Sequence, residues 1–322
     1  MKAIRIHEYG GPEVMRLEDL PTPDAGPGQI LVRVEAAGVN YVDTYQRSGQ
    51  YKVPLPATLG SEGAGEVEAV GPGVTGIQSG TRVAWAGVPG AYATHAVVPA
   101  DKAVPVPDGI DVRQAAAVML QGMTAHYLAR STYPLKAGDT CLVHAGAGGV
   151  GLLLTQMAKA AGARVFTTVS TEEKARLSRE AGADEAILYT REDFAEEVRR
   201  LTGGRGLDVV YDSVGRDTFD KSLDSLLPRG MLVLFGQSSG AVPPLDPQLL
   251  SARGSLFLTR PTLAHYTLTR EELVARAGDC FSWMKSGKLK VRIGAEFPLA
   301  EAPRAHEELQ SRRTTGKVLL IP

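Results

Sequence analysis

The sequence predicts an α/β fold in which a parallel sheet covered by helices is inserted into a β-rich domain. Three observations predict it: short strands between Gly/Pro turns fill roughly the first 120 residues, apolar strands alternate with helices in the middle, and short strands return in the tail. The chain has 322 residues, enough for about two domains. Hydrophobic residues make up 43% and charged residues 22%, so the chain is expected to bury a core.

The N-terminal region has the pattern of a β-rich domain. Its short apolar runs include Ile30–Val34, Gly65–Val70 and Thr81–Trp85, which are separated by Gly/Pro turns. Strands of this length and spacing are typical of a barrel or a sandwich. The proline-rich stretch Val53–Pro56 is expected to be an ordered loop.

The middle of the chain has the alternation that is typical of a parallel sheet with helices on both faces. The expected elements are helix Val112–Thr132, strand Thr140–His144, helix Val150–Ala161, strand Arg164–Val169, helix Glu172–Ala181, strand Glu185–Leu188, helix Glu192–Thr202, and strands Leu207–Tyr211 and Gly230–Phe235. This order of elements predicts successive βαβ units.

The pattern changes again after about residue 262. Helices are expected at Glu271–Ser286 and around Ala302–Gln310, and strands at Val291–Phe297 and Lys317–Ile321. Because this tail is more like the N-terminal region than the middle, we assign it to the first domain. The predicted domains are therefore residues 1–123 with 263–322, and residues 124–262.

Charge and cysteine content argue against several classes of function. The net charge is −1, whereas binding to nucleic acids or anionic membranes calls for a basic excess. The two cysteines, Cys141 and Cys280, are too few for a disulfide framework and fit a reducing compartment. The sequence contains no signal-peptide core and no run of membrane-spanning length. We therefore expect a cytoplasmic protein without a nucleic-acid or membrane partner.

The most specific local motif is a glycine-rich turn between an expected strand and an expected helix. Gly146, Gly148 and Gly151 match the pattern G-x-G-x-x-G, with Gly149 and Val150 between the last two. The first glycine permits a tight turn, the second lets the backbone approach a pyrophosphate, and the third lets the helix pack on the strand. The pyrophosphate would then meet the free N–H groups of the helix N-terminus. The motif predicts a Rossmann dinucleotide site; the alternative is a turn that holds no ligand.

The end of the second strand of this unit indicates which dinucleotide is bound. NAD sites place Asp or Glu there to bind the ribose hydroxyls, but here Ser170 follows the strand and Lys174 lies one helical turn later. A hydroxyl and an ammonium group suit the 2′-phosphate of NADPH. Alternatively, Lys174 is a solvated residue paired with Glu172 or Glu173, so the preference for NADPH stays a prediction.

The motifs together give the chain an end-to-end resemblance to a known family. The sequence resembles the medium-chain dehydrogenase/reductase superfamily and, within it, the quinone oxidoreductases, the group that includes zeta-crystallin. The matching stretches are Ala36–Tyr45, Gly60–Val74, Gln121–Ala125, the glycine motif, Val209–Gly215 and Gly316–Pro322. The resemblance implies a GroES-like catalytic domain built from both chain ends, a Rossmann domain between them, and a homodimer paired through Rossmann edge strands.

The resemblance also bears on metals. Zinc-dependent members of the superfamily bind catalytic zinc through a cysteine near the position of Asn40 and a histidine near that of Ser61, and neither ligand is present here. None of the six histidines forms a spaced pair, whereas catalytic zinc needs about three protein ligands. We therefore expect no metal. Without a Lewis acid, a quinone or enone is an easier substrate than a plain ketone, because its hydride adduct is delocalised.

Site residues are carried over from the family by position. The predicted catalytic or substrate-orienting residues are Asn40, Tyr45 and Tyr51, which would donate hydrogen bonds to a carbonyl oxygen; simple aromatic packing is the alternative for the tyrosines. The predicted cofactor contacts are the glycine motif with Gly149 and Val150, Thr124, Ser170, Lys174, Tyr189, Ser213, Phe235, Gln237, Phe257, Thr259 and Arg312. For Arg312 the alternative is an ordinary surface cation, since Arg313 stands beside it.

The function that the resemblance implies is NADPH-dependent reduction of quinones. One alternative is an NADPH-dependent enone or alkenal double-bond reductase, which differs only in where the hydride is added. A second alternative is a non-enzymatic NADPH-binding protein with a crystallin-like or RNA-binding role. The intact glycine motif and the polar, tyrosine-bearing stretch favour an enzyme, and the near-neutral net charge gives RNA binding no support.

Overall fold

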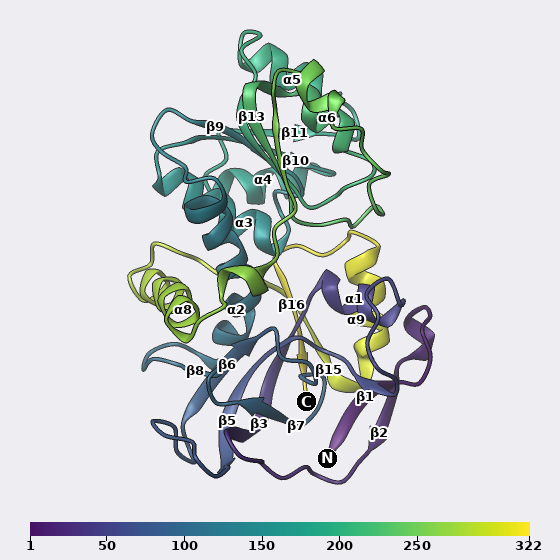
Figure 1. Cartoon of the computed structure of the whole chain (residues 1–322), viewed down its shortest axis with the longest axis vertical. Helices are drawn as coiled ribbons and strands as arrows, with labels where there is room; N and C mark the ends of the chain where they lie inside the picture. The colour runs from purple at the N-terminus through teal and green to yellow at the C-terminus, as the bar shows by residue number, and fades with distance from the viewer. The chain divides into compact units, whose positions relative to one another are not determined.

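The chain folds into two compact units. The computed structural model describes all of residues 1–322 and divides them into a terminal unit, Met1–Met123 with Thr267–Pro322, and a central unit, Thr124–Tyr266. Both chain ends, purple and yellow in Figure 1, belong to the terminal unit. The sequence analysis placed the second boundary between residues 262 and 263, slightly earlier than the observed break at 266 and 267.

The central unit contains a six-stranded parallel sheet with the strand order β11-β10-β9-β12-β13-β14. The strands are β9 (Thr140–Val143), β10 (Arg164–Val169), β11 (Glu185–Leu188), β12 (Leu207–Asp212), β13 (Leu226–Leu234) and β14 (Phe257–Thr259). The chain first winds outward from β9 in one direction and then returns to continue in the other. This order defines a doubly wound Rossmann sheet, as predicted.

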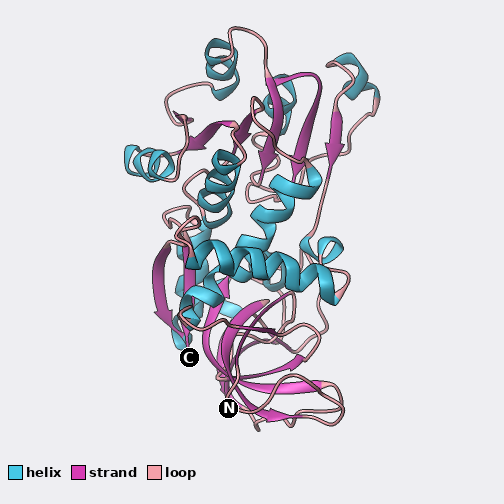
Figure 2. Ribbon diagram, turned by 90° about the vertical axis from the view of Figure 1, so that its left-hand side faces the viewer, coloured by secondary structure: helices cyan, strands magenta, loops and turns pink.

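Helices cover both faces of this sheet. They are α3 (Gly149–Ala160), α4 (Glu172–Glu180), α5 (Phe194–Leu201), α6 (Phe219–Asp224) and α7 (Gln248–Ala252), and Figure 2 shows them in cyan beside the magenta strands. Phe166 and Val169 of β10 point to opposite faces and belong to separate core clusters. Helices α3 and α4 pack on one of these clusters, and α5 and α6 on the other.

The terminal unit contains two sheets. A seven-stranded sheet consists of β3 (Gln29–Val39), β5 (Glu62–Val70), β6 (Arg82–Ala86), β7 (His95–Pro99), β8 (Val104–Pro105), β15 (Ile293–Pro298) and β16 (Lys317–Ile321). A three-stranded sheet consists of β1 (Lys2–Ile6), β2 (Arg16–Asp19) and β4 (Ala57–Thr58). Strand β16 pairs antiparallel with β3, so the C-terminal tail completes the sheet of the N-terminal region. The predicted insertion of the Rossmann sheet into a β-rich domain is therefore confirmed.

The helices of the terminal unit include one that the sequence analysis did not predict. Helix α1 (Tyr41–Arg47) follows β3, whereas α8 (Arg270–Lys285) and α9 (Ala302–Gln310) lie where helices were expected. Helix α2 (Val112–Tyr127) contains the break between the two units and continues as a π-helical turn, Leu128–Thr132. None of the helices is both long and apolar enough to cross a membrane.

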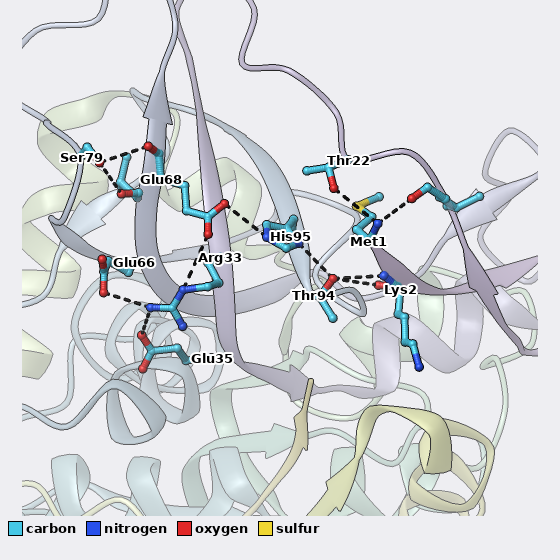
Figure 3. Close-up of polar contacts among 12 residues, drawn as sticks. Met1, Lys2, Thr22, Arg33, Glu35, Glu66, Glu68, Ser79, Thr94 and His95 are labelled. Carbon is cyan, nitrogen blue, oxygen red and sulfur yellow. Dashed lines mark hydrogen bonds and ion pairs between the residues drawn. The ribbon is translucent and has the colours of Figure 1, made fainter.

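Polar side chains form a half-exposed cluster on the seven-stranded sheet (Figure 3). The Arg33 guanidinium lies 3.0 Å from Glu66, 3.6 Å from Glu35 and 3.8 Å from Glu68, and His95 lies 3.2 Å from Glu68. The side chain of Arg33 is 44% exposed. Solvent screens such pairs, and each contributes at most about 1 kcal/mol to stability.

Candidate active site

The glycine motif lies between β9 and α3, as predicted. Strand β9 ends at Val143, and helix α3 begins at Gly149. The Gly148 N–H donates to the Ala145 carbonyl oxygen at 2.9 Å, which closes the turn, and the Gly146 N–H donates to the Thr168 carbonyl oxygen of β10 at 3.0 Å. The turn is therefore held both by itself and by the neighbouring strand.

The three motif glycines differ in the space that surrounds them in this turn. A Cβ on Gly146 would lie 2.5 Å from the Cβ of Thr167, and one on Gly151 would lie 2.3 Å from the Ala145 carbonyl oxygen, so neither position has room for a side chain. A Cβ on Gly148 would have only atoms of Ala145 within 4 Å, the nearest at 3.2 Å. Gly146 and Gly151 thus permit close packing, while Gly148 keeps the backbone open to a ligand.

The N-terminus of α3 fits an anionic group. The N–H groups at the start of a helix, here those of Gly149, Val150 and Gly151, have no intrahelical acceptor, and they carry the positive end of the helix dipole. A glycine turn at a helix N-terminus next to a parallel strand is a ready site for a pyrophosphate. The residues present therefore fit the dinucleotide that the motif predicts.

The predicted 2′-phosphate residues lie together at the carboxyl edge of the Rossmann sheet. Val169 and Leu188, the last residues of β10 and β11, are register partners, and the Tyr189 N–H donates to the Val169 carbonyl oxygen at 3.2 Å. Ser170 and Tyr189 are therefore neighbours. Lys174 stands in the first turn of α4, which Thr171 caps by accepting the Lys174 backbone N–H at 3.3 Å.

One acidic neighbour of this group of residues has a partner that was not considered in the sequence analysis. Glu172, offered there as a partner for Lys174, forms an ion pair with Arg191 at 3.1 Å. Arg191 follows β11 and is a second cation near the end of β10. No carboxylate residue occupies the position directly after β10, which is Ser170.

The other predicted cofactor residues divide between the two units. Ser213 follows β12, Phe235 and Gln237 follow β13, Phe257 and Thr259 are the first and last residues of β14, and Thr124 is a buried residue of α2. All of these belong to the central unit. Arg312 belongs to the terminal unit, in the exposed turn after α9 with a φ of 59°.

A buried carboxylate that the sequence analysis missed shapes the loop after β12. Asp212 is fully buried, and its Oδ1 accepts the N–H groups of Val214 at 2.7 Å and Gly215 at 2.9 Å. Its Oδ2 accepts the hydroxyl of Thr218 at 2.7 Å. In the sequence, this role is indicated only by the position of a charged residue at the end of an apolar strand.

The predicted tyrosines lie together in the terminal unit. Tyr45 is buried in α1, while Tyr51 is 39% exposed in the loop that follows. Their rings meet edge to face with centroids 5.3 Å apart, and the Tyr51 N–H donates to the Tyr45 carbonyl oxygen at 2.9 Å. Tyr51 is therefore held on a rigid aromatic support while part of its ring remains accessible.

Asn40, the third predicted catalytic residue, is instead engaged in a buried network. Its Nδ2 donates to Glu62 at 2.8 Å and to the Gly38 carbonyl oxygen at 3.3 Å, and its Oδ1 accepts from Lys317 at 2.8 Å. Both amide hydrogens are thus already used. Through these bonds the amide of Asn40 connects β3, β5 and β16.

The ion pair at the centre of this network is almost completely buried. Lys317 and Glu62 are 1% and 0% exposed, and the Lys317 ammonium donates to Glu62 Oε2. Glu62 Oε1 accepts the Leu120 backbone N–H of α2 at 2.6 Å. Because every polar atom of the Glu62 carboxylate has a donor, the buried charge is compensated. Both residues lie in stretches that carry the family resemblance, but nothing in the sequence pairs them.

A second buried network surrounds Asp43 of α1. Its carboxylate accepts from the hydroxyl of Ser61 at 2.8 Å, the hydroxyl of Tyr92 at 3.0 Å and the backbone N–H of Asn40 at 2.9 Å. Tyr92 also contacts Nε2 of His306 at 3.0 Å. Burial raises the pKa of Asp43 to about 6, against the opposing effect of these donors, and lowers the pKa of His306 to about 3.

The raised pKa of Asp43 is expected to make stability depend on pH. Because the pKa of Asp43 is about 6 in the folded chain, against an ordinary value of 3.8 for an aspartate, the folded state holds this proton more tightly. The contribution of the Asp43 proton to the free energy of unfolding is present below pH 4 and is lost as the pH rises through 6. A pKa difference of this size corresponds to about 3 kcal/mol.

Urea unfolding of the wild type and of Asp43→Asn between pH 4 and pH 7 measures this contribution. The free energy of unfolding of the wild type should fall relative to that of the variant as the pH rises. Parallel pH profiles for the two proteins would contradict the assignment of this titration to Asp43.

The structure contains no group of three or more His, Cys, Asp or Glu side chains arranged to hold a metal ion. At the two positions that the zinc-dependent relatives use for ligands, Asn40 and Ser61 bind Glu62, Lys317 and Asp43 instead. Cys141 and Cys280 are both buried free thiols, in β9 and α8.

Comparisons with known proteins agree with both halves of the fold. Residues 26–108 match the model of the alcohol dehydrogenase GroES-like domain, and residues 149–280 match the model of the zinc-binding dehydrogenases. The "Quinone oxidoreductase" of Pseudomonas aeruginosa is 52% identical, with 100% of this chain and 99% of that protein covered. The "Quinone oxidoreductase 1" of Escherichia coli is 47% identical, with 99% of each covered.

A solved structure of a quinone oxidoreductase is likewise similar to this chain over its full length. The crystal structure of Escherichia coli quinone oxidoreductase complexed with NADPH has a TM-score of 0.98 and 46% sequence identity, and all of each chain is covered. A 2-haloacrylate reductase from a Burkholderia species is also similar, at 44% identity with 98% of each chain covered. The predicted resemblance is thus confirmed, and the chain belongs to the quinone oxidoreductase family of the medium-chain dehydrogenase/reductase superfamily.

Proposed function

We propose that this chain is an NADPH-dependent oxidoreductase that transfers reducing equivalents from NADPH to quinones. The observation that carries the proposal is the glycine turn at the N-terminus of α3, next to strand β10, which is followed directly by Ser170 and then by Lys174 in the first turn of α4. The relatives named quinone oxidoreductase, and the NADPH complex of one of them, support the same conclusion.

The residues of the central unit provide the means to hold the cofactor. Backbone N–H groups at the start of α3 bind the pyrophosphate, and the open side of Gly148 leaves it space. Ser170, Lys174 and Tyr189 bind the 2′-phosphate through a hydroxyl, an ammonium and a phenol, all of which are donors. Asp212 holds the loop after β12 in place through two backbone N–H groups.

The chemistry requires little from the protein beyond binding and orientation. NADPH supplies a hydride, which together with one proton reduces a quinone to a hydroquinone. Tyr51, with a partly exposed ring and a phenolic hydroxyl, is proposed to orient the quinone oxygen. The buried ring of Tyr45 packs edge to face against Tyr51 and holds it in place. We propose that the reaction uses no metal, since Asn40 and Ser61 are committed to Glu62, Lys317 and Asp43.

A second candidate substrate class is favoured by one relative. A protein named 2-haloacrylate reductase is 44% identical over nearly the whole chain. A haloacrylate has a carbon–carbon double bond conjugated to a carboxylate, so its reduction resembles that of an enone. Reduction of an activated double bond is therefore the alternative activity for the same cofactor site.

A Lys174→Ala variant tests the cofactor assignment. NADPH oxidation is followed by absorbance with 1,4-benzoquinone and larger quinones, with NADH in parallel. Loss of a hydrogen bond from a charged donor is worth about 1.5–3 kcal/mol, so the KM for NADPH should rise roughly tenfold or more. The KM for NADH should not change, because NADH has no 2′-phosphate.

The matched control is Arg179→Ala, which removes another cation at the far end of α4. It should leave both KM values unchanged. Quinone-dependent oxidation with no selective effect of Lys174→Ala would refute the 2′-phosphate site but not the reaction. If no quinone accelerates NADPH oxidation, quinone reduction is wrong, and 2-haloacrylates and enones become the substrates to test.

We also propose an assembly and a location for the chain. Strand β14 is an edge strand of the Rossmann sheet, and its Phe257 is 57% exposed. An edge strand has unpaired backbone groups that a second copy can satisfy, which supports a homodimer paired through β14. Two buried free cysteines fit a cytoplasmic location.

A further inference from the structure

His144 is a buried titratable residue that the proposed function does not use. It directly follows β9, lies two residues before Gly146, and is 1% exposed. The Phe194 ring packs edge to face against its imidazole, with centroids 4.8 Å apart. A polar ring in this position needs hydrogen-bond partners for both of its nitrogens.

Both nitrogens of His144 have such partners. Nδ1 lies 2.8 Å from the Thr168 hydroxyl of β10, and Nε2 lies 3.0 Å from the Ser222 hydroxyl of α6. The Ser222 hydroxyl in turn donates to Asp212 Oδ2 at 3.1 Å. One imidazole therefore connects β9 to β10 and, through Ser222, to the carboxylate at the end of β12.

The direction of each hydrogen bond in this chain follows from Asp212. Because Ser222 donates its one hydroxyl hydrogen to Asp212 Oδ2, it must accept from the Nε2–H of His144. Burial lowers the pKa of His144, which keeps the ring neutral with a single N–H. Nδ1 is then the acceptor, and the Thr168 hydroxyl donates to it.

Thr168 is the residue at which this series of hydrogen bonds reaches the proposed cofactor site. Its carbonyl oxygen accepts the Gly146 N–H at 3.0 Å, while its hydroxyl is held by His144. Ser170 is two residues further along, followed by the helix that carries Lys174. The position of the proposed 2′-phosphate site relative to the glycine turn therefore depends on Thr168.

We propose that His144 is a positioning residue for the dinucleotide, and that its contact with Thr168 determines the preference for NADPH over NADH. The imidazole holds the end of β10 against the glycine turn, so that the pyrophosphate and the 2′-phosphate meet their donors at the same time. The inference rests on the proposed function only for the identity of the cofactor.

Three substitutions separate the two contacts of His144. Thr168→Val removes the hydroxyl with little change of shape. His144→Asn keeps an acceptor near the position of Nδ1 but loses the donor to Ser222, whereas His144→Gln keeps a donor near Nε2 but loses the acceptor for Thr168. Thr155→Val is the control, because the buried Thr155 hydroxyl in α3 has no hydrogen-bond partner to lose.

The measurement is the Kd of each purified full-length protein for NADPH and for NADH, by fluorescence titration without quinone. One lost hydrogen bond of this kind corresponds to roughly a three- to tenfold change. Thr168→Val and His144→Gln should raise the Kd for NADPH by about this factor and leave that for NADH within about twofold. His144→Asn and Thr155→Val should keep the wild-type ratio of the two constants.

Thermal unfolding of the same proteins identifies a purely structural role. If the variants unfold at lower temperature but retain the wild-type ratio of NADPH to NADH affinity, His144 only stabilises the fold and the proposal is wrong. Equal weakening of both cofactors in Thr168→Val would also overturn it. Since no quinone is present, a failure of quinone reduction cannot be mistaken for either result.

Discussion

Replacing Lys317 by methionine is expected to lower the free energy of unfolding by about 3–5 kcal/mol. The substitution keeps the length of the side chain but removes the ammonium that donates to Glu62 and Asn40. The Glu62 carboxylate, 0% exposed, would then be a buried charge without its counter-charge. Urea unfolding at neutral pH measures the loss.

Two further variants test whether the uncompensated charge of Glu62 causes this loss of stability. Glu62→Gln combined with Lys317→Met removes both charges, and the double variant should be more stable than Lys317→Met alone, because a neutral amide costs less to bury. Arg33→Met, in the half-exposed cluster of Figure 3, should cost less than Lys317→Met, because solvent screens each of its ion pairs to at most about 1 kcal/mol. If Lys317→Met is no more destabilising than Arg33→Met, the buried pair has no special role.

Gly151→Ala is expected to reduce the affinity for NADPH by about 100-fold or more, equivalent to about 2.7 kcal/mol. The new Cβ would lie 2.3 Å from the Ala145 carbonyl oxygen and 3.0 Å from the Gly146 Cα, both of which are backbone atoms of the glycine turn. Backbone cannot move aside as the end of a long side chain can. The turn must therefore open, which separates the N–H groups that bind the pyrophosphate.

Gly278→Ala is the matched control for this substitution. Gly278 lies inside α8, and a Cβ there would have no neighbour within 4 Å. Alanine in an open helical position stabilises a protein by about 0.5–1 kcal/mol, so this variant should unfold at a slightly higher temperature and bind NADPH normally. Normal NADPH binding by Gly151→Ala would show that the turn is not the pyrophosphate site.

Local pattern was enough to predict most of the Rossmann sheet. The strands Arg164–Val169 and Glu185–Leu188 have the predicted bounds, because short segments of mostly apolar and β-branched residues between helical patterns are typical of parallel strands. Helix α1 was missed, since its seven residues show no apolar periodicity and four of them are of types that favour strands. Its start depends instead on Asp43, which accepts the Asn40 N–H from inside the helix.

The glycine turn was predictable for a similar reason, whereas the buried network of the terminal unit was not. The turn is a contiguous motif whose strand and helix adjoin it in the sequence. Lys317 lies 255 residues from Glu62 and 277 from Asn40, and only the pairing of β16 with β3 brings them together. Without knowledge of strand register, a lysine beginning an apolar strand has no identifiable partner.

The pairing of β16 with β3 also has a consequence for synthesis on the ribosome. The central unit is continuous in sequence, from Thr124 to Tyr266, so all of its strands have been translated before the terminal unit has received its last one. Strand β3 is translated early, but it cannot pair with β16 until nearly the whole chain has been made. We therefore expect the nucleotide-binding unit to fold first during translation, while the nascent N-terminal strands remain open to chaperones.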